Sequence, residues 1–218
     1  MNTTETQVGQ LGAVILAGGE ATRLPGKCFR VLGGKELILH VFERISQVTK
    51  DIVVSVRNAQ QADRVKQLLQ ATPIVQDSIQ KQSPLVGLVS GLRASRKPYI
   101  FAAPCDTIFI EPEVIRLLLR RAIGNDGAIP MAEGNLLEPL CAVYRRESAL
   151  LAAEKPIQND RLSMLEMITQ LTKLIRVPVE DIRRIDPQLL TLRNINTEQD
   201  MAWATEIIQT RNVNKALK

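Results

Sequence analysis

The chain has 218 residues, enough for one domain with a sizeable core, and 45% of them are hydrophobic, as in an ordinary globular protein. Only 3% are aromatic, so a stacking surface for single-stranded nucleic acid is not expected. The formal net charge of +5 suits an anionic substrate as well as plain solubility. No apolar run approaches the roughly 20 residues of a membrane helix, so no membrane partner is expected. Given the low aromatic content, no nucleic-acid partner is expected either.

The chain opens with a polar segment, residues 1–10, which has no basic start followed by an apolar stretch and therefore does not resemble a signal peptide. The apolar run 14–16 then predicts a strand buried on both faces. It ends in Gly18 and Gly19, which allow a sharp turn and leave backbone N–H groups accessible. Such a turn binds anions, and two nearby cations, Arg23 and Lys27, favour a polyphosphate.

Two common phosphate-binding loops are excluded by the spacing around these glycines. A Walker loop needs Gly-x-x-x-x-Gly-Lys-Ser/Thr, whereas Gly26-Lys27 has Ala21 at the first position and Cys28 at the last. A dinucleotide fingerprint needs Gly-x-Gly-x-x-Gly, which the residues after Gly18 do not supply. The glycine pair alone would indicate only a tight turn, and the two cations raise the phosphate interpretation above it.

Strands and helices alternate through the first half of the chain. Hydrophobic periodicity predicts strands at 51–56, 73–77 and 99–103 and helices at 37–48, 59–70, 84–95 and 111–123. The second half is less regular, with strands at 127–130, 140–144 and 174–179, helices at 147–154 and 161–171, and a last helix whose N-cap is Thr197, with Asp200 three residues on. The β-α order predicts a parallel sheet with right-handed crossovers.

We therefore expect an α/β fold: one domain with a mostly parallel open sheet and helices on both faces. The domain is expected to span residues 11–210, with a nucleoside-triphosphate-binding half at 11–123 and an acceptor-binding half at 124–210. Residues 1–10 and 211–218 are expected to be a loose lead and tail.

Two carboxylates follow the predicted strands directly. Asp77 and Asp106 lie just past the carboxyl ends of two strands, at the sheet edge where Gly18 and Gly19 are also expected. Mg²⁺ is usually held by one or two carboxylates together with substrate phosphates, so Asp106 is the predicted metal ligand. Two alternatives stay open: Asp106 as the N-cap of the next helix, and Asp77 as an ordinary turn carboxylate.

The three cysteines and the single histidine give weaker indications. An odd number of cysteines argues against a disulfide framework and favours a reducing compartment, so we expect a cytoplasmic protein in which Cys105 is a small buried residue. His40 lies within a predicted amphipathic helix and is expected to pack rather than to catalyse.

An ordered series of motifs resembles the nucleotidyltransferases of the molybdenum cofactor guanylyltransferase (MobA) type. The most specific is Pro104-Cys105-Asp106-Thr107. The others are Leu16-Ala17-Gly18-Gly19, Arg23, Gly26-Lys27, Asp77-Ser78, Pro84-Leu85-Val86-Gly87-Leu88, Glu138-Pro139-Leu140-Cys141-Ala142-Val143-Tyr144 and Asn194-Ile195-Asn196-Thr197. The chain departs from the family pattern in a shorter link from Arg23 to Lys27, in Ile108 after the Pro-Cys-Asp-Thr motif, and in Ser83 before Pro84.

The resemblance implies a Rossmann-like nucleotide-diphospho transferase fold and a role for each matched residue. Lys27 would bind the phosphates of GTP, Asp77 would contact the nucleotide, and Asp106 would hold Mg²⁺. Ser55 lies where the family often has an Asn that contacts the nucleotide. The remaining residues implied are the glycine-loop backbone at Leu16, Ala17, Gly18 and Gly19, and the pair Asn194 and Asn196 near the pterin phosphate or the metal.

The implied reaction is the transfer of GMP from GTP to the phosphate of molybdopterin or molybdenum cofactor, with release of pyrophosphate. The acceptor phosphate is already ionised, so no general base is required, and Arg23, Lys27 and Asp106 would supply positioning and charge neutralisation. Open alternatives are another phosphate acceptor (cobinamide phosphate, phospholactate or a sugar phosphate), CTP as donor, or a non-catalytic GTP-binding scaffold. Further cofactor-assembly proteins are expected as partners of a monomer or small homo-oligomer.

Overall fold

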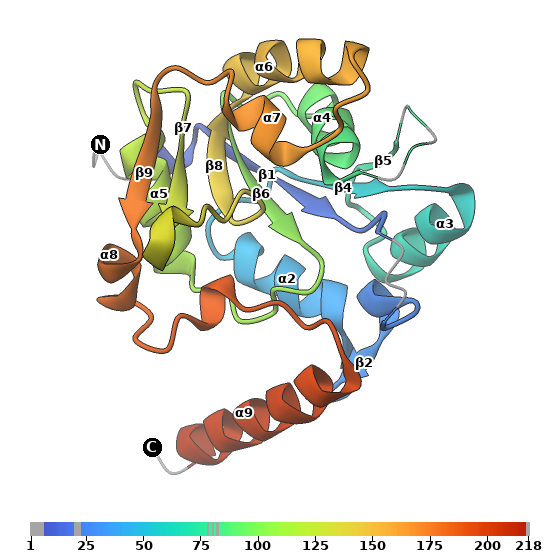
Figure 1. Cartoon of the computed structure of the whole chain (residues 1–218). Coiled ribbons are helices and arrows are strands. Elements are labelled where there is room, and N and C mark those ends of the chain that lie inside the picture. The colour runs from blue at the N-terminus through green and yellow to red at the C-terminus, as the bar shows by residue number, and fades with distance from the viewer. Residues whose placement is uncertain (1–6, 20–22, 78, 80, 82, 217–218) are drawn as a thin grey trace.

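The computed structural model describes residues 7–19, 23–77, 79, 81 and 83–216, without the side chains from 211 onward. Its centre is a seven-stranded sheet with the order β5-β4-β1-β6-β8-β7-β9 (Figure 1). The strands are β1 (Leu11–Leu16), β4 (Ile52–Val56), β5 (Ile74–Gln76), β6 (Tyr99–Pro104), β7 (Gly127–Met131), β8 (Ala142–Arg145) and β9 (Leu174–Pro178).

The sheet is parallel except at one strand. β1 pairs in parallel with β4 and β6, and β4 pairs in parallel with β5, as the alternating pattern of the first half predicts. β8 lies antiparallel between β6 and β7, and β7 then pairs in parallel with β9. The expectation of a mostly parallel open sheet is confirmed, and the antiparallel insertion belongs to the half whose sequence pattern is less regular.

Helices cover both faces of the sheet (Figure 1). One face carries α4 (Pro84–Ala94), α6 (Arg146–Gln158) and α7 (Met164–Ile168), whose buried side chains form one apolar cluster with Val14 and Ile100. The other face carries α2 (Leu37–Ser46), α3 (Ala59–Leu68) and α5 (Pro112–Ala122). The short α8 (Val179–Arg183) and the long α9 (Glu198–Ala216) complete the chain.

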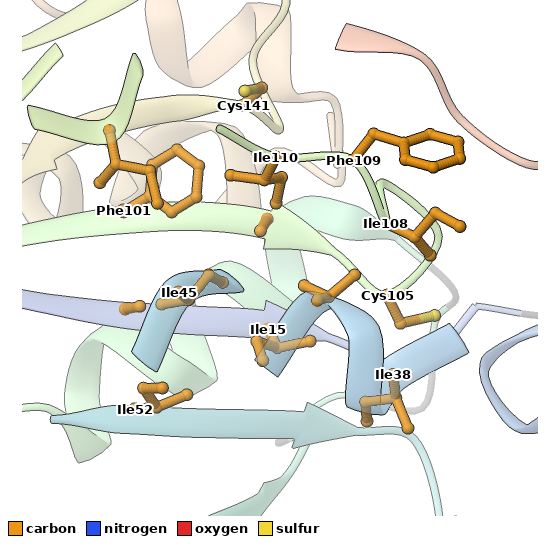
Figure 2. Close-up of a cluster of buried hydrophobic side chains, with 14 of the residues drawn as sticks. Ile15, Ile38, Ile45, Ile52, Phe101, Cys105, Ile108, Phe109, Ile110 and Cys141 are labelled. Atoms are coloured by element: carbon orange, nitrogen blue, oxygen red, sulfur yellow. The ribbon is translucent and has the colours of Figure 1, made fainter. Parts of the chain in front are cut away.

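Alternation along the central strands sorts the core into its two layers. Ile15 and Phe101 point to the face covered by α2, where Figure 2 shows them in the same cluster as Ile38. Val14 and Ile100, which precede them in their strands, face α4 instead. All five side chains are fully buried. Burying both faces of these strands fixes their register, so their carboxyl ends come together at one edge of the sheet.

A small hairpin joins the first loop to α2. Its strands are β2 (Val31–Leu32) and β3 (Lys35–Glu36). The two linking residues, Gly33 and Gly34, have φ angles of 60° and 81°, which a two-residue hairpin with positive φ at both positions requires. His40 on α2 packs against this hairpin, with its Nε2 2.9 Å from the Leu32 carbonyl oxygen, as expected for a packing histidine.

Several element bounds differ from the sequence-based expectation. Only Met164–Ile168 of the expected helix 161–171 is helical, because Asp160 adopts a positive φ of 57° and Ser163 caps the helix. α9 continues to Ala216, beyond residue 210, where the domain was expected to end. Of the expected loose ends, residues 1–6 and 217–218 lie outside the described residues. Within the described ranges, no helix is long and apolar enough to cross a bilayer.

Candidate nucleotide-binding site

A pocket of about 300 Å³ opens at the carboxyl edge of the parallel strands, where α/β sheets bind ligands. Its size is at the lower end of small-molecule sites. The residues that line it are Leu16, Gly18, Gly19, Lys27, Cys28, Arg57, Asp77, Ser83, Pro84, Pro104, Cys105, Asp106, Leu140, Asn194 and Asn196.

The two glycines after β1 meet very different surroundings. A Cβ atom at Gly18 would lie 3.0 Å from the backbone nitrogen of Arg57 and 3.1 Å from Oδ2 of Asp77, closer than a side chain comfortably allows. A Cβ atom at Gly19 would meet nothing within 4 Å among the residues that the structure describes, which exclude residues 20–22. Gly18 is therefore required by the protein's own packing, whereas Gly19 lines the pocket and its Cβ position is open with respect to the described residues.

Lys27 and Asp106 form the polar centre of the pocket. Lys27 lies at the start of the short helix Lys27–Phe29, and Asp106 follows the end of β6. Lys27 Nζ forms an ion pair with Asp106 Oδ2 and donates a second hydrogen bond of 2.9 Å to Asn196 Oδ1. The two charged side chains are only 17% and 5% exposed, so their interaction is screened far less than a surface pair.

A capping box at the start of α9 places Asn196 in this cluster. Thr197 and Asp200 exchange hydrogen bonds, with Thr197 N–H donating to Asp200 Oδ2 over 2.9 Å and Asp200 N–H to Thr197 Oγ1 over 3.1 Å. The same carboxylate also accepts the backbone N–H of Asn196 at 2.9 Å. The N–H of Ile195 donates to the Asp106 carbonyl oxygen at 3.1 Å, and Asn196 accepts from Lys27, so this segment is held against both members of the ion pair. The predicted cap is confirmed.

Asp77 forms a second polar group with β4. Ser55, which is 1% exposed, donates a hydrogen bond of 2.7 Å from Oγ to Asp77 Oδ1. The backbone N–H of Asp77 donates to the Val56 carbonyl oxygen at 2.8 Å. Arg57 lines the same side of the pocket and acts electrostatically on Asp77. Ser55 thus orients Asp77 through one carboxylate oxygen, Oδ1, and the other carboxylate oxygen, Oδ2, faces Gly18.

Burial raises the pKa of both carboxyl groups. Desolvation dominates at Asp106, where it outweighs the charge and hydrogen bond of Lys27, and the pKa is raised. Desolvation also dominates at Asp77, where the Ser55 hydrogen bond and the charge of Arg57 oppose it without restoring the usual pKa. Perturbed acids that converge in one pocket are typical of functional sites.

Asp106 has the features expected of a metal ligand that works with a substrate. Its Oδ1 is buried and meets no hydrogen-bond partner among the residues that the structure describes. Within those residues there is also no group of three or more His, Cys, Asp or Glu that could hold a metal alone. A divalent cation at Asp106 would therefore need further oxygen ligands, such as substrate phosphates and water, as Mg²⁺ usually does. The alternative of Asp106 as a helix cap does not hold, because α5 begins at Pro112 after Glu111.

The expectation that the cysteines form no disulfide was wrong. Cys28 and Cys105 form a disulfide across a sequence separation of 77, and Cys141 remains as a buried free cysteine. Cys105 is buried, as expected, but it is not an isolated thiol. An odd cysteine count allows one pair and one residue left over, so it did not exclude this bond.

The structure brings most of the predicted site residues together. Those that line the pocket are Leu16, Gly18, Gly19, Lys27, Asp77, Asp106, Asn194 and Asn196. Ala17 is buried behind the glycine loop, and Ser55 reaches the site through Asp77. Arg23 is exposed and does not line the pocket in the part of the chain that is described.

Sequence reasoning missed Arg57, Leu140 and the cysteine pair as pocket residues. Arg57 could have been found, because it lies two positions beyond Ser55 at the end of β4. The cysteines also carried a signal, since Cys28 follows Lys27 and Cys105 precedes Asp106 in the chain.

The chain matches the MobA-like NTP transferase domain over residues 13–172. That match covers the glycine loop, both carboxylates and most of the sheet. The chain belongs to the MobA-like NTP transferase family. The resemblance drawn from the motifs and the expectation of a nucleotidyltransferase enzyme are thereby confirmed.

Two relatives and one solved structure are similar to this protein along most of its chain. The chain is 34% identical over 197 residues to a probable molybdenum cofactor guanylyltransferase of Methanosarcina acetivorans, with 87% of each chain covered. It is 33% identical over 196 residues to the protein of the same description from Methanosarcina mazei, again with 87% of each chain covered. The crystal structure of molybdopterin-guanine dinucleotide biosynthesis protein A from Archaeoglobus fulgidus has a TM-score of 0.79 at 28% identity, and the match covers 91% of this chain and 99% of that one.

Proposed function

We propose that this protein transfers GMP from GTP to the terminal phosphate of molybdopterin or its molybdenum-loaded form and releases pyrophosphate. The observation that carries the proposal is the convergence of Gly18, Lys27, Asp77 and Asp106 on one pocket at the carboxyl edge of the sheet. The names of the similar proteins, molybdenum cofactor guanylyltransferases, supply the donor and the acceptor.

The open side of Gly19 and the N–H groups of the glycine loop suit the phosphates of the nucleotide. Asp77, oriented by the hydrogen bond from Ser55, is proposed to contact the nucleoside. Gly18-Gly19 in this register favours guanine over cytosine, by the family resemblance. The acceptor is proposed to enter along Leu140, Asn194 and Asn196, which line the pocket from the second half of the chain.

In the proposed reaction, an oxygen of the pterin phosphate forms a bond to the α-phosphorus of GTP. The bond from that phosphorus to the bridging oxygen breaks, and pyrophosphate leaves with the electron pair. Both reactants are anions, so the barrier is one of positioning and repulsion rather than of proton removal. Lys27, kept in place by Asn196, would neutralise negative charge on the transferred group. Arg23, on the exposed side of the loop, would do so for the leaving pyrophosphate.

Mg²⁺ is the proposed cofactor, with Asp106 as its protein ligand. Oδ1 of Asp106, which is buried and has no hydrogen-bond partner among the described residues, supports this assignment, because an isolated buried carboxylate oxygen suits a hard cation. When bound, the ion would act as a Lewis acid on the phosphate oxygens. With the ion bound, Asp106 would no longer pair with Lys27, and the Lys27 ammonium group would be available to the phosphates.

The cytoplasm is the proposed compartment, where GTP is available as the donor. A monomer or small homo-oligomer that meets other cofactor-assembly proteins remains the expected assembly.

Pyrophosphate release tests the proposal directly. The purified protein is incubated with Mg²⁺, molybdopterin and each of the four nucleoside triphosphates in turn, and then with GTP and other phosphate acceptors. Release only with GTP and molybdopterin is the expected result. Release only with CTP, or only with cobinamide phosphate, phospholactate or a sugar phosphate, would replace the proposed substrates. Binding of GTP without release under any condition would favour a scaffold.

A further inference from the structure

The disulfide lies directly beside the reactive centre of the pocket. Cys28 is the chain neighbour of Lys27, and Cys105 is the chain neighbour of Asp106. The Cα atoms of the two cysteines are 5.4 Å apart, and both residues line the pocket although each is only 5% exposed. The bond therefore ties together the two backbone segments that present the ion pair.

The cross-linked arrangement keeps the carboxylate occupied by the lysine. Lys27 contacts Asp106 Oδ2 and is held from its other side by Asn196, while Asp106 Oδ1 stays without a partner among the described residues. A metal–nucleotide complex needs the opposite arrangement, with the lysine on phosphate and the carboxylate on the cation. A covalent bond between the flanking residues resists the separation that this exchange requires.

Reduction would offer Cys28 a different partner. Its Sγ lies 3.6 Å from the carbonyl oxygen of Ala17, in the glycine loop. A thiol can donate a hydrogen bond to that oxygen, whereas a disulfide sulfur has no proton to donate. Two unbonded sulfur atoms also need more space than two bonded ones, so Lys27 and Asp106 can move apart. In a tightly placed site, a shift of about 1 Å can change the rate by about a hundredfold.

We propose that Cys28 and Cys105 form a redox-modification site that controls access of metal-bound GTP to Asp106. The disulfide holds the pocket with Lys27 on Asp106, and the dithiol allows the exchange. For turnover, this inference rests on the proposed function; for GTP binding, it can be tested by itself. A cytoplasmic compartment would keep the pair reduced, and oxidising conditions would form the disulfide.

The redox step balances as an ordinary thiol–disulfide exchange with a dithiol reductant. A thiolate of the reductant attacks one sulfur of the pair, the protein S–S bond breaks, and a mixed disulfide forms. The second thiol of the reductant then displaces the protein sulfur and closes its own disulfide. Two electrons pass to the protein, and its two sulfurs take up two protons. Access is through the pocket, which both cysteines line.

The test prepares the full chain in two states, treated with dithiothreitol or with oxidised glutathione, and then freed of reagent. Alkylation after denaturation, followed by mass spectrometry, should label all three cysteines in the first state and only Cys141 in the second. GTP binding with Mg²⁺ is measured by calorimetry, and pyrophosphate release with molybdopterin is measured in parallel. We expect the oxidised state to bind GTP about tenfold more weakly or worse, and to turn over correspondingly slowly.

Variants show whether the difference comes from this bond. In Cys28→Ser and Cys105→Ser, the ratio of GTP affinities between the reduced and the oxidised preparation should be close to one. In Cys141→Ala this ratio should be the same as in the parent protein. Equal GTP affinity in two states whose disulfide content is verified by mass would overturn the proposal, as would failure of the disulfide to form. A redox effect on GTP binding in the absence of any pyrophosphate release would support the site and reject only the proposed function.

Discussion

Lys27 and Asp106 are 79 positions apart in the sequence and meet as an ion pair in the pocket at the carboxyl edge of the sheet. The lysine comes from the loop after β1 and the aspartate from the end of β6, two strands that are neighbours in the sheet. In the absence of substrate, each therefore neutralises the other. Binding of a metal–nucleotide complex is expected to separate them, with each charge passing to a ligand of opposite sign.

Replacing Asp106 with Asn should abolish metal-dependent turnover while the fold survives. The change keeps the size of the side chain but removes the charge that would hold the cation, so we expect at least a hundredfold loss of turnover, or about 2.7 kcal/mol of barrier. A matched control is Asp51→Asn, because Asp51 is 57% exposed and pairs with Lys97 at the opposite edge of the sheet. Retention of activity within about tenfold would remove Asp106 as the metal ligand.

The two loop glycines should respond differently to alanine. Gly18→Ala should lower the melting temperature, because the new Cβ would crowd Arg57 and Asp77 at 3.0 and 3.1 Å. The new Cβ of Gly19→Ala meets no atom of the described residues within 4 Å, so stability should be unchanged while GTP affinity falls. Differential scanning calorimetry and GTP titration of both variants separate the two effects. Unchanged GTP affinity in Gly19→Ala would mean that the phosphates do not pass over this residue.

Ser55→Ala removes the hydrogen bond that orients Asp77. A buried hydrogen bond contributes about 1 kcal/mol, so we expect a similar loss of stability and a several-fold weaker affinity for GTP. Ser90→Ala is the control, since Ser90 is also buried and bonds within α4 to the Val86 carbonyl oxygen at 3.0 Å. Both variants should lose stability in urea unfolding, but only Ser55→Ala should lose GTP affinity. Equal affinities would show that Asp77 needs no such support.

Asp200 should give a pH-dependent contribution to stability. Partial burial acts to raise its pKa, but hydrogen bonds from the backbone of Asn196 and from Thr197 outweigh this and lower it from the usual 3.8. A carboxyl group whose pKa is lower in the folded than in the unfolded protein stabilises the fold at pH values above its unfolded-state pKa. This contribution is lost as the pH falls through the folded-state pKa. Asp200→Asn should therefore cost about 1 kcal/mol near neutral pH, and the difference should shrink under acidic conditions.

Urea unfolding of the parent protein and Asp200→Asn at about pH 7 and about pH 3 measures this difference. Asp63→Asn, at an exposed position on α3, provides the comparison for removing a carboxylate outside the capping box. A cost for Asp200→Asn that grows toward acidic pH would contradict the expected sign of this pH dependence.

Much of the site could be predicted because it lies at strand ends. Buried runs mark the parallel strands, and the residue that follows each run must lie at the same edge, which is how Gly18, Asp77 and Asp106 could be grouped. The cap at Thr197 was equally visible, since it depends only on residues three positions apart.

Other features depend on how distant segments pack. The contact of Lys27 with Asn196 joins residues 169 positions apart, and no local pattern specifies it. The same holds for the antiparallel insertion of β8. The bond between Cys28 and Cys105 was indicated only indirectly, because each cysteine is the chain neighbour of a predicted site residue. Periodicity reports which face of an element is buried, but the partner of that face is chosen by the whole fold.

Product identification tests the proposed guanylyl transfer most directly. The protein is incubated with GTP, Mg²⁺ and molybdopterin. The products are separated, their masses are determined by mass spectrometry, and the pyrophosphate released is quantified. We expect a pterin product that has gained one GMP, in equal amount to the pyrophosphate released. Unmodified molybdopterin and intact GTP, under conditions in which another nucleotide or another phosphate acceptor is consumed, would contradict the proposed reaction.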